Sequence, residues 1–195
     1  MPSYLKKTLT YLVLSTLAVL ILISLLFTFI YTGVFGPLPN QEDLKSIRKE
    51  QATLVLASDG SILGKFFAEN RTNISIDEIP THLLQALIAT EDKRFYQHEG
   101  YDIRSYFRVI FKSILLGDES SGGGSTITQQ LVKNLFGREY HGFLSMPINK
   151  AKEAIIATRM EEIYSKEEIL VLYLNSVPFG EEVFGIEAAS IRYFN

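Results

Sequence analysis

Hydrophobic positions are concentrated in one N-terminal run of this 195-residue chain. No charged residue occurs between Lys7 and Glu42, and the stretch from Tyr11 to Tyr31 reads YLVLSTLAVLILISLLFTFIY. A helix needs about 20 apolar residues to cross a bilayer core of roughly 30 Å. A cleaved secretory signal has a shorter apolar part, about 7–15 residues, followed by small residues, whereas this run ends among aromatic residues. A core helix without a polar face is unusual in so small a chain, so the pattern predicts a transmembrane signal-anchor over residues 11–33.

Basic residues set the predicted orientation of this helix. Lys6 and Lys7 flank it on the N-terminal side, and the next basic residue is Lys45. Basic residues accumulate on the cytoplasmic side of a membrane. The sequence therefore predicts a cytoplasmic tail over residues 1–10 and a single-pass protein whose remainder, after about residue 33, is exported across the membrane.

Residues 34–74 combine a linker with a predicted β-hairpin. Glycine and proline gather at positions 36–39, which predicts a linker, and the polar stretch Glu42–Glu50 predicts a short helix. Two β-prone runs within Thr53–Phe67 flank an Asp59-Gly60 pair, which is a strong short-range hairpin signal.

The remaining residues, 75–195, show mostly helical spacing of apolar positions. Ser75–Pro80 resembles a helix start, and the glycine-rich run Gly117–Gly124 predicts a flexible loop. Either Ser125 or Thr126 can cap the helix that follows, and Gly137 predicts its end. Residues 140–147 are predicted to be irregular. Further helices are predicted over Thr81–Thr90, Asp102–Leu116, Pro147–Ile163, from the Ser165 capping box to Leu174, and over Glu181–Phe194. The fold class is therefore mostly α.

Composition excludes several classes of protein. The chain has no cysteine, which excludes a disulfide framework, a cysteine-based zinc site and a cysteine nucleophile. Its net charge is −3, and without Lys6 and Lys7 the exported part carries −5. A nucleic-acid-binding protein usually has a basic excess, so no nucleic-acid partner is predicted.

One candidate site is the run Glu91-Asp92-Lys93-Arg94-Phe95-Tyr96-Gln97-His98-Glu99-Gly100. Two adjacent carboxylates follow an apolar helix face and precede an aromatic pair. A carboxylate at the edge of an apolar pocket can serve as an acid or a base. A charged run of this kind is also typical of a solvated helix end, so the residues alone leave both interpretations open.

A second candidate is the run from Gly122 to Asn134, GGGSTITQQLVKN. Exposed backbone N–H groups at a helix N-terminus attract phosphate, but the Gly-Lys-Ser/Thr of a Walker loop is missing. A flexible linker explains the glycines, although it does not explain the hydroxyls, two glutamines and a lysine that follow. Two further clusters, Asn149–Glu153 and Tyr173–Gly180, are on their own typical of a surface ion pair and of a helix end.

Together these clusters resemble a known family. The patterns Glu-Asp-x-x-Phe-x-x-His-x-Gly, Gly-Gly-Ser-Thr-Ile-Thr-Gln-Gln-Leu-x-Lys-Asn, Lys-x-x-Glu and Tyr-Ser-Lys-x-Glu-Ile-Leu-x-Leu-Tyr-Leu-Asn are similar to those of the peptidoglycan glycosyltransferases of family 51. These enzymes form the N-terminal module of class A penicillin-binding proteins and also occur as monofunctional transglycosylases. The resemblance covers about Ser75 to Asn195, and the N-terminal anchor agrees with it.

The resemblance implies a fold and a reaction. The fold is a lysozyme-like α domain with a membrane-proximal jaw lobe, to which Asp102–Leu116 and the glycine loop are expected to belong. The substrates are lipid II and the growing glycan strand, which is the donor. An acceptor hydroxyl attacks the anomeric carbon with inversion, so that a β-1,4 glycan strand forms and undecaprenyl pyrophosphate leaves. Other cell-wall synthases are partners that the resemblance leaves open.

The resemblance also implies roles for single residues. Glu91 matches the catalytic base, and Glu153 matches a second important glutamate that orients the donor or holds a divalent cation, Mg²⁺ or Mn²⁺, at the pyrophosphate. No cofactor beyond this open metal is implied. Lys150 matches a residue that contacts the pyrophosphate. The remaining substrate-binding positions implied are Asp92, Phe95, His98, Ser125, Thr126, Gln129, Gln130, Lys133 and Asn134, with the first three read as supports of the loop.

The sequence departs from the family pattern in two ways. Asn149 stands where family members often have arginine, and Arg138, Arg159 and His141 are candidates to supply the missing charge. The family's transferase domain continues beyond the position of Asn195, so the last core helices are expected to lie outside this sequence. Two other functions therefore stay open: a non-catalytic protein that binds lipid II or cell-wall synthases, and a lysozyme-like glycan-cleaving enzyme.

Overall fold

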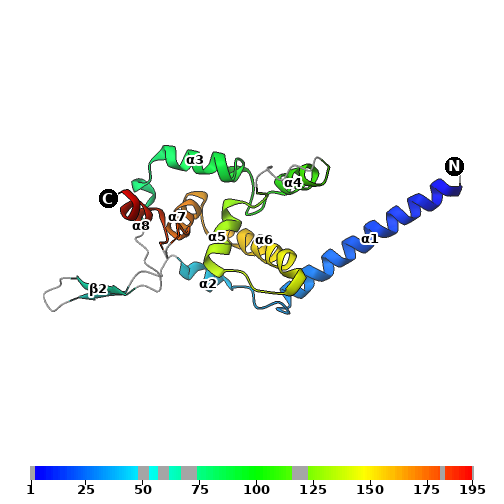
Figure 1. Ribbon diagram of the computed structural model, residues 1–195. Helices are drawn as coiled ribbons and strands as arrows, with labels where there is room; N and C mark the ends of the chain where they lie inside the picture. The colour runs from blue at the N-terminus through cyan, green and yellow to red at the C-terminus, as the bar shows by residue number, and fades with distance from the viewer. Residues whose placement is uncertain are drawn as a thin grey trace. The chain divides into compact units, whose positions relative to one another are not determined.

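The structure is a computed structural model that describes residues 3–47, 53–56, 62–66, 74–115, 123–180 and 183–194. Most of these residues are helical, which confirms the mostly α class (Figure 1). The described chain divides into two compact units, one of residues 1–38 and 139–152 and one of residues 39–138 and 153–195. The helices are α1 (Ser3–Tyr31), α2 (Gln41–Ser46), α3 (Thr81–Glu91), α4 (Ile103–Leu115), α5 (Ile127–Phe136), α6 (Ser145–Ile163), α7 (Lys166–Ser176) and α8 (Ile186–Phe194).

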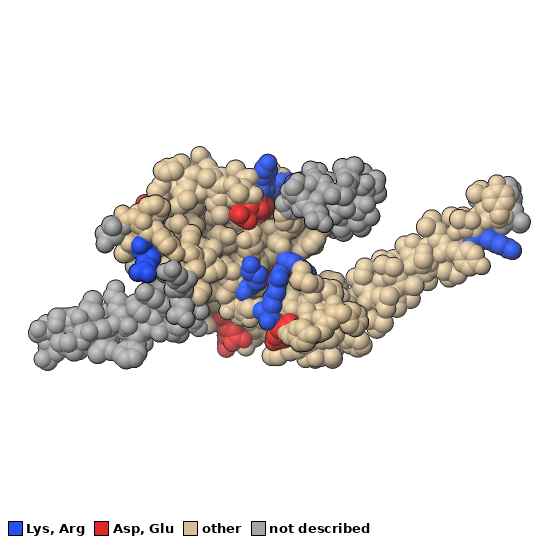
Figure 2. Space-filling model, viewed as in Figure 1, with Lys and Arg blue, Asp and Glu red and all other residues tan. Residues whose placement is uncertain are grey.

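The N-terminal apolar run forms one continuous helix, α1. Within its span from Tyr4 to Tyr31, an 18-residue window has a mean hydropathy of 2.7, and 6% of that window is buried. Figure 2 shows it as an uncharged rod with basic side chains near its N-terminal end only. The core helix of a soluble protein would be mostly buried, so this exposure argues against the alternative of a core helix. Among the described residues, α1 is the one helix long and apolar enough to cross a membrane.

In the first unit, the segment that follows α1 is tied to the start of α6. The ring of Phe35 lies edge-on to that of His141, with centroids 5.5 Å apart. Lys152 Nζ donates to the Phe35 carbonyl at 2.8 Å and pairs with Glu139 at 3.1 Å. Asn149 is buried, and its amide donates to the carbonyl oxygens of Glu139 and Ser145. The Asn149 side chain therefore holds the backbone at Glu139 and at Ser145 in place.

In the second unit, the core forms where α5 and α7 pack together (Figure 1). Apolar side chains recur on the inner faces of these helices and of α6, as the helical spacing predicts. Complete burial of one such side chain stabilises the fold by about 1.5–3 kcal/mol. The fully buried side chains of these helices include Ile127, Leu131, Met160, Ile169 and Leu170, and Phe95, outside them, is also fully buried.

Capping residues fix the ends of the helices that carry the sequence motifs. Thr126, rather than Ser125, caps α5, because its hydroxyl accepts the N–H of Gln129 while the Gln129 side chain accepts the Thr126 N–H. Ser165 opens α7 with the predicted capping box. Gly137 ends α5 with φ +69°, a conformation that favours glycine. These caps each contribute about 1 kcal/mol.

Two predicted helix starts were inaccurate. Residues 140–147 contain the 3₁₀ helix η4 (Gly142–Leu144) and the start of α6 at Ser145, since proline at position 147 is compatible with a first helical turn. Helix α8 begins at Ile186 instead of Glu181. Before it, Pro178 pairs with Phe184 in an isolated bridge that closes a turn.

Short elements connect the helices of the second unit. The 3₁₀ helix η2 (Ile76–Glu78) has the capping box expected of the Ser75 helix start, and η3 (Phe95–Gln97) follows α3. The strands β1 (Thr53–Leu56) and β2 (Ile62–Phe66) pair antiparallel. The predicted Asp59-Gly60 turn and most of the Gly117–Gly124 loop lie outside the described residues, and the hairpin and the jaw lobe stay predictions.

Candidate active site

The candidate base, Glu91, is the last residue of α3 and its side chain is exposed. The Gln130 amide donates to Glu91 Oε2 at 2.8 Å, and the Tyr173 hydroxyl donates to Gln130 Oε1 at 3.2 Å. Burial raises the pKa of the Tyr173 hydroxyl, and the negative charge of Glu91 raises that pKa further. Helices α3, α5 and α7 thus bring three side chains into one hydrogen-bonded chain that ends on an exposed carboxylate.

The residues after Glu91 turn back into the core. Asp92 Oδ2 accepts the N–H of Ile127 at 3.1 Å and lies 2.8 Å from His98 Nε2. Phe95 is fully buried. These contacts hold the segment after Glu91 against the start of α5. The role of Asp92, Phe95 and His98 as supports of a substrate-binding loop stays a prediction.

Gly100 closes this segment at a point of very close approach. Its φ is +90°, and a Cβ at this position would lie 2.6 Å from the backbone carbonyl carbon of Ala157. The Gly100 carbonyl oxygen also accepts the Thr126 hydroxyl at 2.7 Å. Only glycine fits at position 100, between the start of α5 and helix α6, without displacing backbone.

The second motif contributes both buried and exposed residues. Thr126 and Gln129 are buried, and the Gln129 amide donates to the Tyr106 hydroxyl at 3.0 Å. Burial raises the pKa of Tyr106; the hydrogen bond to Gln129 opposes this, and the charge of Glu153 adds to the rise. Lys133 is exposed, whereas Ser125, Gln130 and Asn134 are half-buried. The exposed and half-buried side chains are therefore the ones available to a ligand.

The second glutamate, Glu153, is held differently from Glu91. It is 3% exposed, and Arg138 Nε donates to its Oε1 at 2.7 Å. Of the candidates for the missing charge, Arg138 thus contacts Glu153 directly, and Arg159 donates to the Pro39 carbonyl. His141 belongs to the first unit and lies beside Glu139. Lys150 is half-buried in that same unit.

Another arginine–carboxylate pair lies at the start of α4. Asp102 accepts two hydrogen bonds from the Arg94 guanidinium, the shorter at 2.6 Å, and its other oxygen accepts the N–H groups of Arg104 and Ser105. Burial alone would raise the pKa of Asp102. The hydrogen bonds from Arg94 and Ser105, together with the Arg94 charge, outweigh this effect and lower the pKa. The pair lines a polar cavity of about 560 Å³ next to His98.

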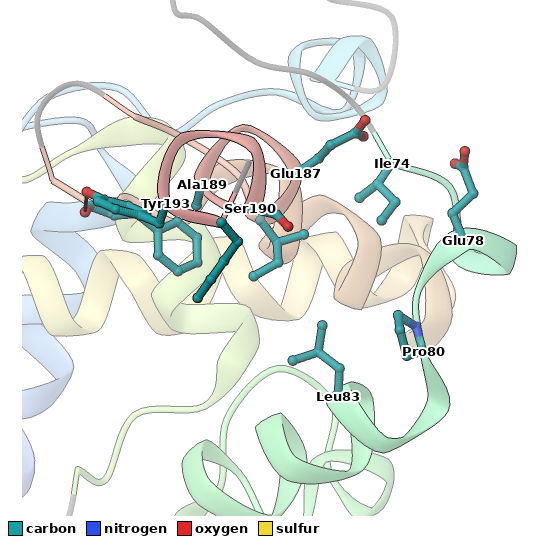
Figure 3. Close-up of a pocket in the computed structure, with 11 residues that line it drawn as sticks. Ile74, Glu78, Pro80, Leu83, Glu187, Ala189, Ser190 and Tyr193 are labelled. Carbon is teal, nitrogen blue, oxygen red and sulfur yellow. Dashed lines mark hydrogen bonds between the residues drawn. The ribbon is translucent and has the colours of Figure 1, made fainter.

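An apolar groove of about 580 Å³ lies at the opposite end of α3 from Glu91. Figure 3 shows Leu83 and Pro80 on one side of the groove and Ala189, Ser190 and Tyr193 of α8 on the other. The sequence analysis did not predict this groove, because its two walls are far apart in the chain.

The described residues do not fit a metal centre of their own. No group of three or more His, Cys, Asp or Glu side chains within the described ranges is arranged to hold a metal ion. Glu153, the residue for which the sequence leaves Mg²⁺ or Mn²⁺ open, already has a guanidinium against one carboxylate oxygen. We therefore derive no step of a reaction through a metal.

Sequence patterns did not indicate a role for Tyr173 or Tyr106, and they named Arg138 only as one of three candidates for the missing charge. Tyr173 belongs to a motif that looked like a simple helix end, Arg138 follows a helix-ending glycine, and Tyr106 lies on an amphipathic helix. A Tyr-Leu-Asn signature at a helix end was the available signal for Tyr173. For Arg138 and Tyr106, pairing depends on the tertiary fold and no local pattern indicates it.

Comparison with known proteins assigns the family. The family model described as Transglycosylase matches residues 59–195. The chain is 44% identical over 153 residues to penicillin-binding protein 1F of Bacillus subtilis, covering 78% of this chain and 21% of the relative. It is 41% identical over 184 residues to penicillin-binding protein 1A of Mycobacterium tuberculosis, covering 92% and 22%. With penicillin-binding protein 1A of Escherichia coli the identity is 35% over 165 residues, covering 85% and 19%.

An exposed carboxylate that accepts a hydrogen bond from the second motif, on a mostly helical fold with an apolar N-terminal helix, is consistent with a peptidoglycan transglycosylase. The chain belongs to the transglycosylase family. It spans about a fifth of the length of the curated relatives it matches.

Proposed function

We propose that this protein is a peptidoglycan glycosyltransferase that polymerises lipid II into β-1,4 glycan strands with inversion. The observation that carries the proposal is the exposed Glu91 carboxylate, which accepts a hydrogen bond from Gln130 within the second family motif. A base must reach the hydroxyl it deprotonates, so exposure together with a fixed orientation is what the role requires.

In this proposal, Glu91 accepts the proton of the lipid II hydroxyl that attacks the anomeric carbon of the growing strand. The bond from that carbon to the pyrophosphate oxygen breaks, and undecaprenyl pyrophosphate leaves with its charge. Positive side chains stabilise this developing charge. Lys133 and Lys150 are assigned this role, and each charge-assisted contact contributes about 1.5–3 kcal/mol. Ser125 and Asn134 are assigned to the donor side of the site.

Glu153 is proposed to orient the donor sugar, with Arg138 as the positive group beside it. Their 2.7 Å ion pair supports this assignment, because it puts a guanidinium at the third motif in a chain that has Asn149 in place of arginine. Thr126 and Gln129 are buried and are proposed to shape the cleft from below.

The proposed setting is a bacterial inner membrane, with α1 as its single span and Lys6 and Lys7 on the cytoplasmic side. The amphipathic helix α4, on which Ile103 and Phe107 are exposed, is assigned to the membrane-proximal jaw. Other cell-wall synthases are partners that this location allows. A single cysteine placed at Tyr4 or at Glu187, labelled with an impermeant maleimide in intact cells, tests the orientation: only the latter is expected to react.

The decisive experiment incubates the purified chain with labelled lipid II and separates the products by size. Wild type is expected to make glycan strands, whereas Glu91→Gln is expected to make none, and Glu167→Gln, an exposed glutamate of α7, serves as control. Binding of lipid II without polymerisation by wild type would favour the non-catalytic alternative. Shortening of purified glycan strands would favour a glycan-cleaving enzyme.

A further inference from the structure

A buried carboxylate that no family motif quoted above includes lies beneath the segment after Glu91. Glu161, near the end of α6, is 5% exposed as a side chain. Its Oε1 accepts the Thr128 hydroxyl at 2.5 Å, and its Oε2 accepts Lys166 Nζ at 2.6 Å. Burial of a carboxylate is costly unless partners compensate for the lost water, so an apolar residue would serve simple packing better.

Lys166, the first residue of α7, connects Glu161 to the segment that follows Glu91. Its Nζ also donates to the His98 carbonyl oxygen at 2.7 Å and lies 4.4 Å from the centre of the Phe95 ring. One ammonium group therefore holds this segment at two points. An ammonium over an aromatic face is an additional attraction.

The imidazole of His98 completes the network from the other side. Its Nε2 lies 2.8 Å from Asp92 Oδ2, and its Nδ1 lies 3.9 Å from Glu161 Oε1 without a hydrogen-bond partner among the described residues. The ring thus stands between two carboxylates. Asp92 is covalently next to Glu91, so a displacement of this network moves the carboxylate proposed as the base.

We propose that Glu161 and Lys166 are positioning residues, which clamp residues 92–100 onto α5, α6 and α7 and so fix the direction of the Glu91 carboxylate. The proposal rests on the role assigned to Glu91 above. A misplacement of about 1 Å at a reacting group can lower a rate by roughly 100-fold, which makes such a clamp consequential. Neither residue needs to touch the substrate.

Glu162, the next residue of α6, is exposed and provides a matched control. The experiment compares full-length wild type, Glu161→Gln, Lys166→Met, Lys166→Arg and Glu162→Gln, each in detergent micelles. Hydrogen–deuterium exchange followed by mass spectrometry reports opening of residues 92–100, and lipid II polymerisation gives kcat and KM.

In Glu161→Gln and Lys166→Met, we expect exchange of residues 92–100 to be about tenfold faster while α5 and α7 keep their protection. We expect kcat to fall about 10–100-fold with KM within about twofold, because orientation and not binding is lost. Lys166→Arg is expected to recover most of kcat, and Glu162→Gln is expected to behave as wild type.

Unchanged exchange of residues 92–100 in both variants would overturn the proposal. So would faster exchange spread evenly over the chain with kcat lost in proportion to the folded fraction, since that result describes general stability. If wild type makes no glycan, the proposed function fails, and the exchange result alone then decides whether the clamp exists.

Discussion

The two glutamates assigned to the site are held in opposite ways. Glu91 ends a helix with an exposed carboxylate and accepts its hydrogen bond from a neutral amide, Gln130. Glu153 lies inside a helix, is 3% exposed and is paired with a guanidinium. A carboxylate that must exchange protons with a substrate needs access, whereas one that must keep its charge and direction needs partners. Both residues are glutamates, so the proposed roles, a base for Glu91 and orientation of the donor for Glu153, follow from the difference in environment and not from the residue type.

The largest expected effect is the loss of activity in Glu91→Gln. Removal of a general base typically lowers a rate by about 10²–10⁴-fold. Because the side chain is exposed and the amide is isosteric, the free energy of unfolding is expected to change by less than about 0.5 kcal/mol. Polymerisation rate and urea unfolding on the same samples check both parts. A large loss of stability would mean that Glu91 is structural and would remove the contrast with Glu153.

Unlike Glu91→Gln, Arg138→Met is expected to change chiefly the free energy of unfolding. The variant removes the guanidinium that donates to Glu153 and keeps most of the apolar volume. A hydrogen bond to a charged group contributes about 1.5–3 kcal/mol, and the partial exposure of Arg138 places the expected loss at the lower end. The double variant Arg138→Met/Glu153→Gln should recover part of this loss in urea unfolding. Equal losses in the single and double variants would show that the pair is not coupled.

Tyr173→Phe is expected to lower kcat by a smaller factor, because it disturbs only the orientation of Glu91. It removes the hydroxyl that donates to Gln130, so Gln130 loses a contact that orients its amide. We expect a three- to tenfold loss of kcat, equivalent to about 1 kcal/mol, with little change in stability. Steady-state kinetics on lipid II measure it. A similar loss in Leu174→Val, a packing change one residue along α7, would argue for general loosening of the helix instead.

The smallest expected effect concerns Asp102, which is also paired with an arginine, Arg94. Its pKa is lowered in the folded protein, so it contributes stability that is present above the ordinary pKa of aspartate, about 3.9, and that is lost as the pH falls through the folded value. Urea midpoints at pH 7 and at pH 3 should therefore differ less in Asp102→Asn than in wild type. An unchanged difference would mean that Asp102 does not contribute to acid sensitivity.

Sequence patterns predicted the helices well where side-chain chemistry is local. The Ser165 capping box, the Gly137 helix end and the apolar spacing of Thr81–Thr90 act over a few residues, and the structure confirms each of them. The start of α8 was predicted too early because the turn before it depends on the pairing of Pro178 with Phe184. No local preference indicates that pairing.

The candidate site could be predicted only in part for the same reason. The motifs named Glu91, Gln130 and Glu153, which all lie in the second unit, yet they did not indicate that Gln130 bonds to Glu91 or that Arg138 pairs with Glu153. Such partners come from separate segments of the chain, and spacing along one helix carries no information on them. The catalytic roles themselves stay predictions until the substitutions are measured.

The close approach at Gly100 has a consequence for the mutational tolerance of this segment. A β-carbon at position 100 would come within 2.6 Å of backbone atoms of a neighbouring helix, and backbone atoms, unlike the end of a long side chain, have nowhere to move. Glu99, one residue earlier, is exposed. In a library that varies both positions, functional clones should accept many residues at 99 and glycine alone at 100, so the steepest change in tolerance along the chain should fall between two adjacent residues.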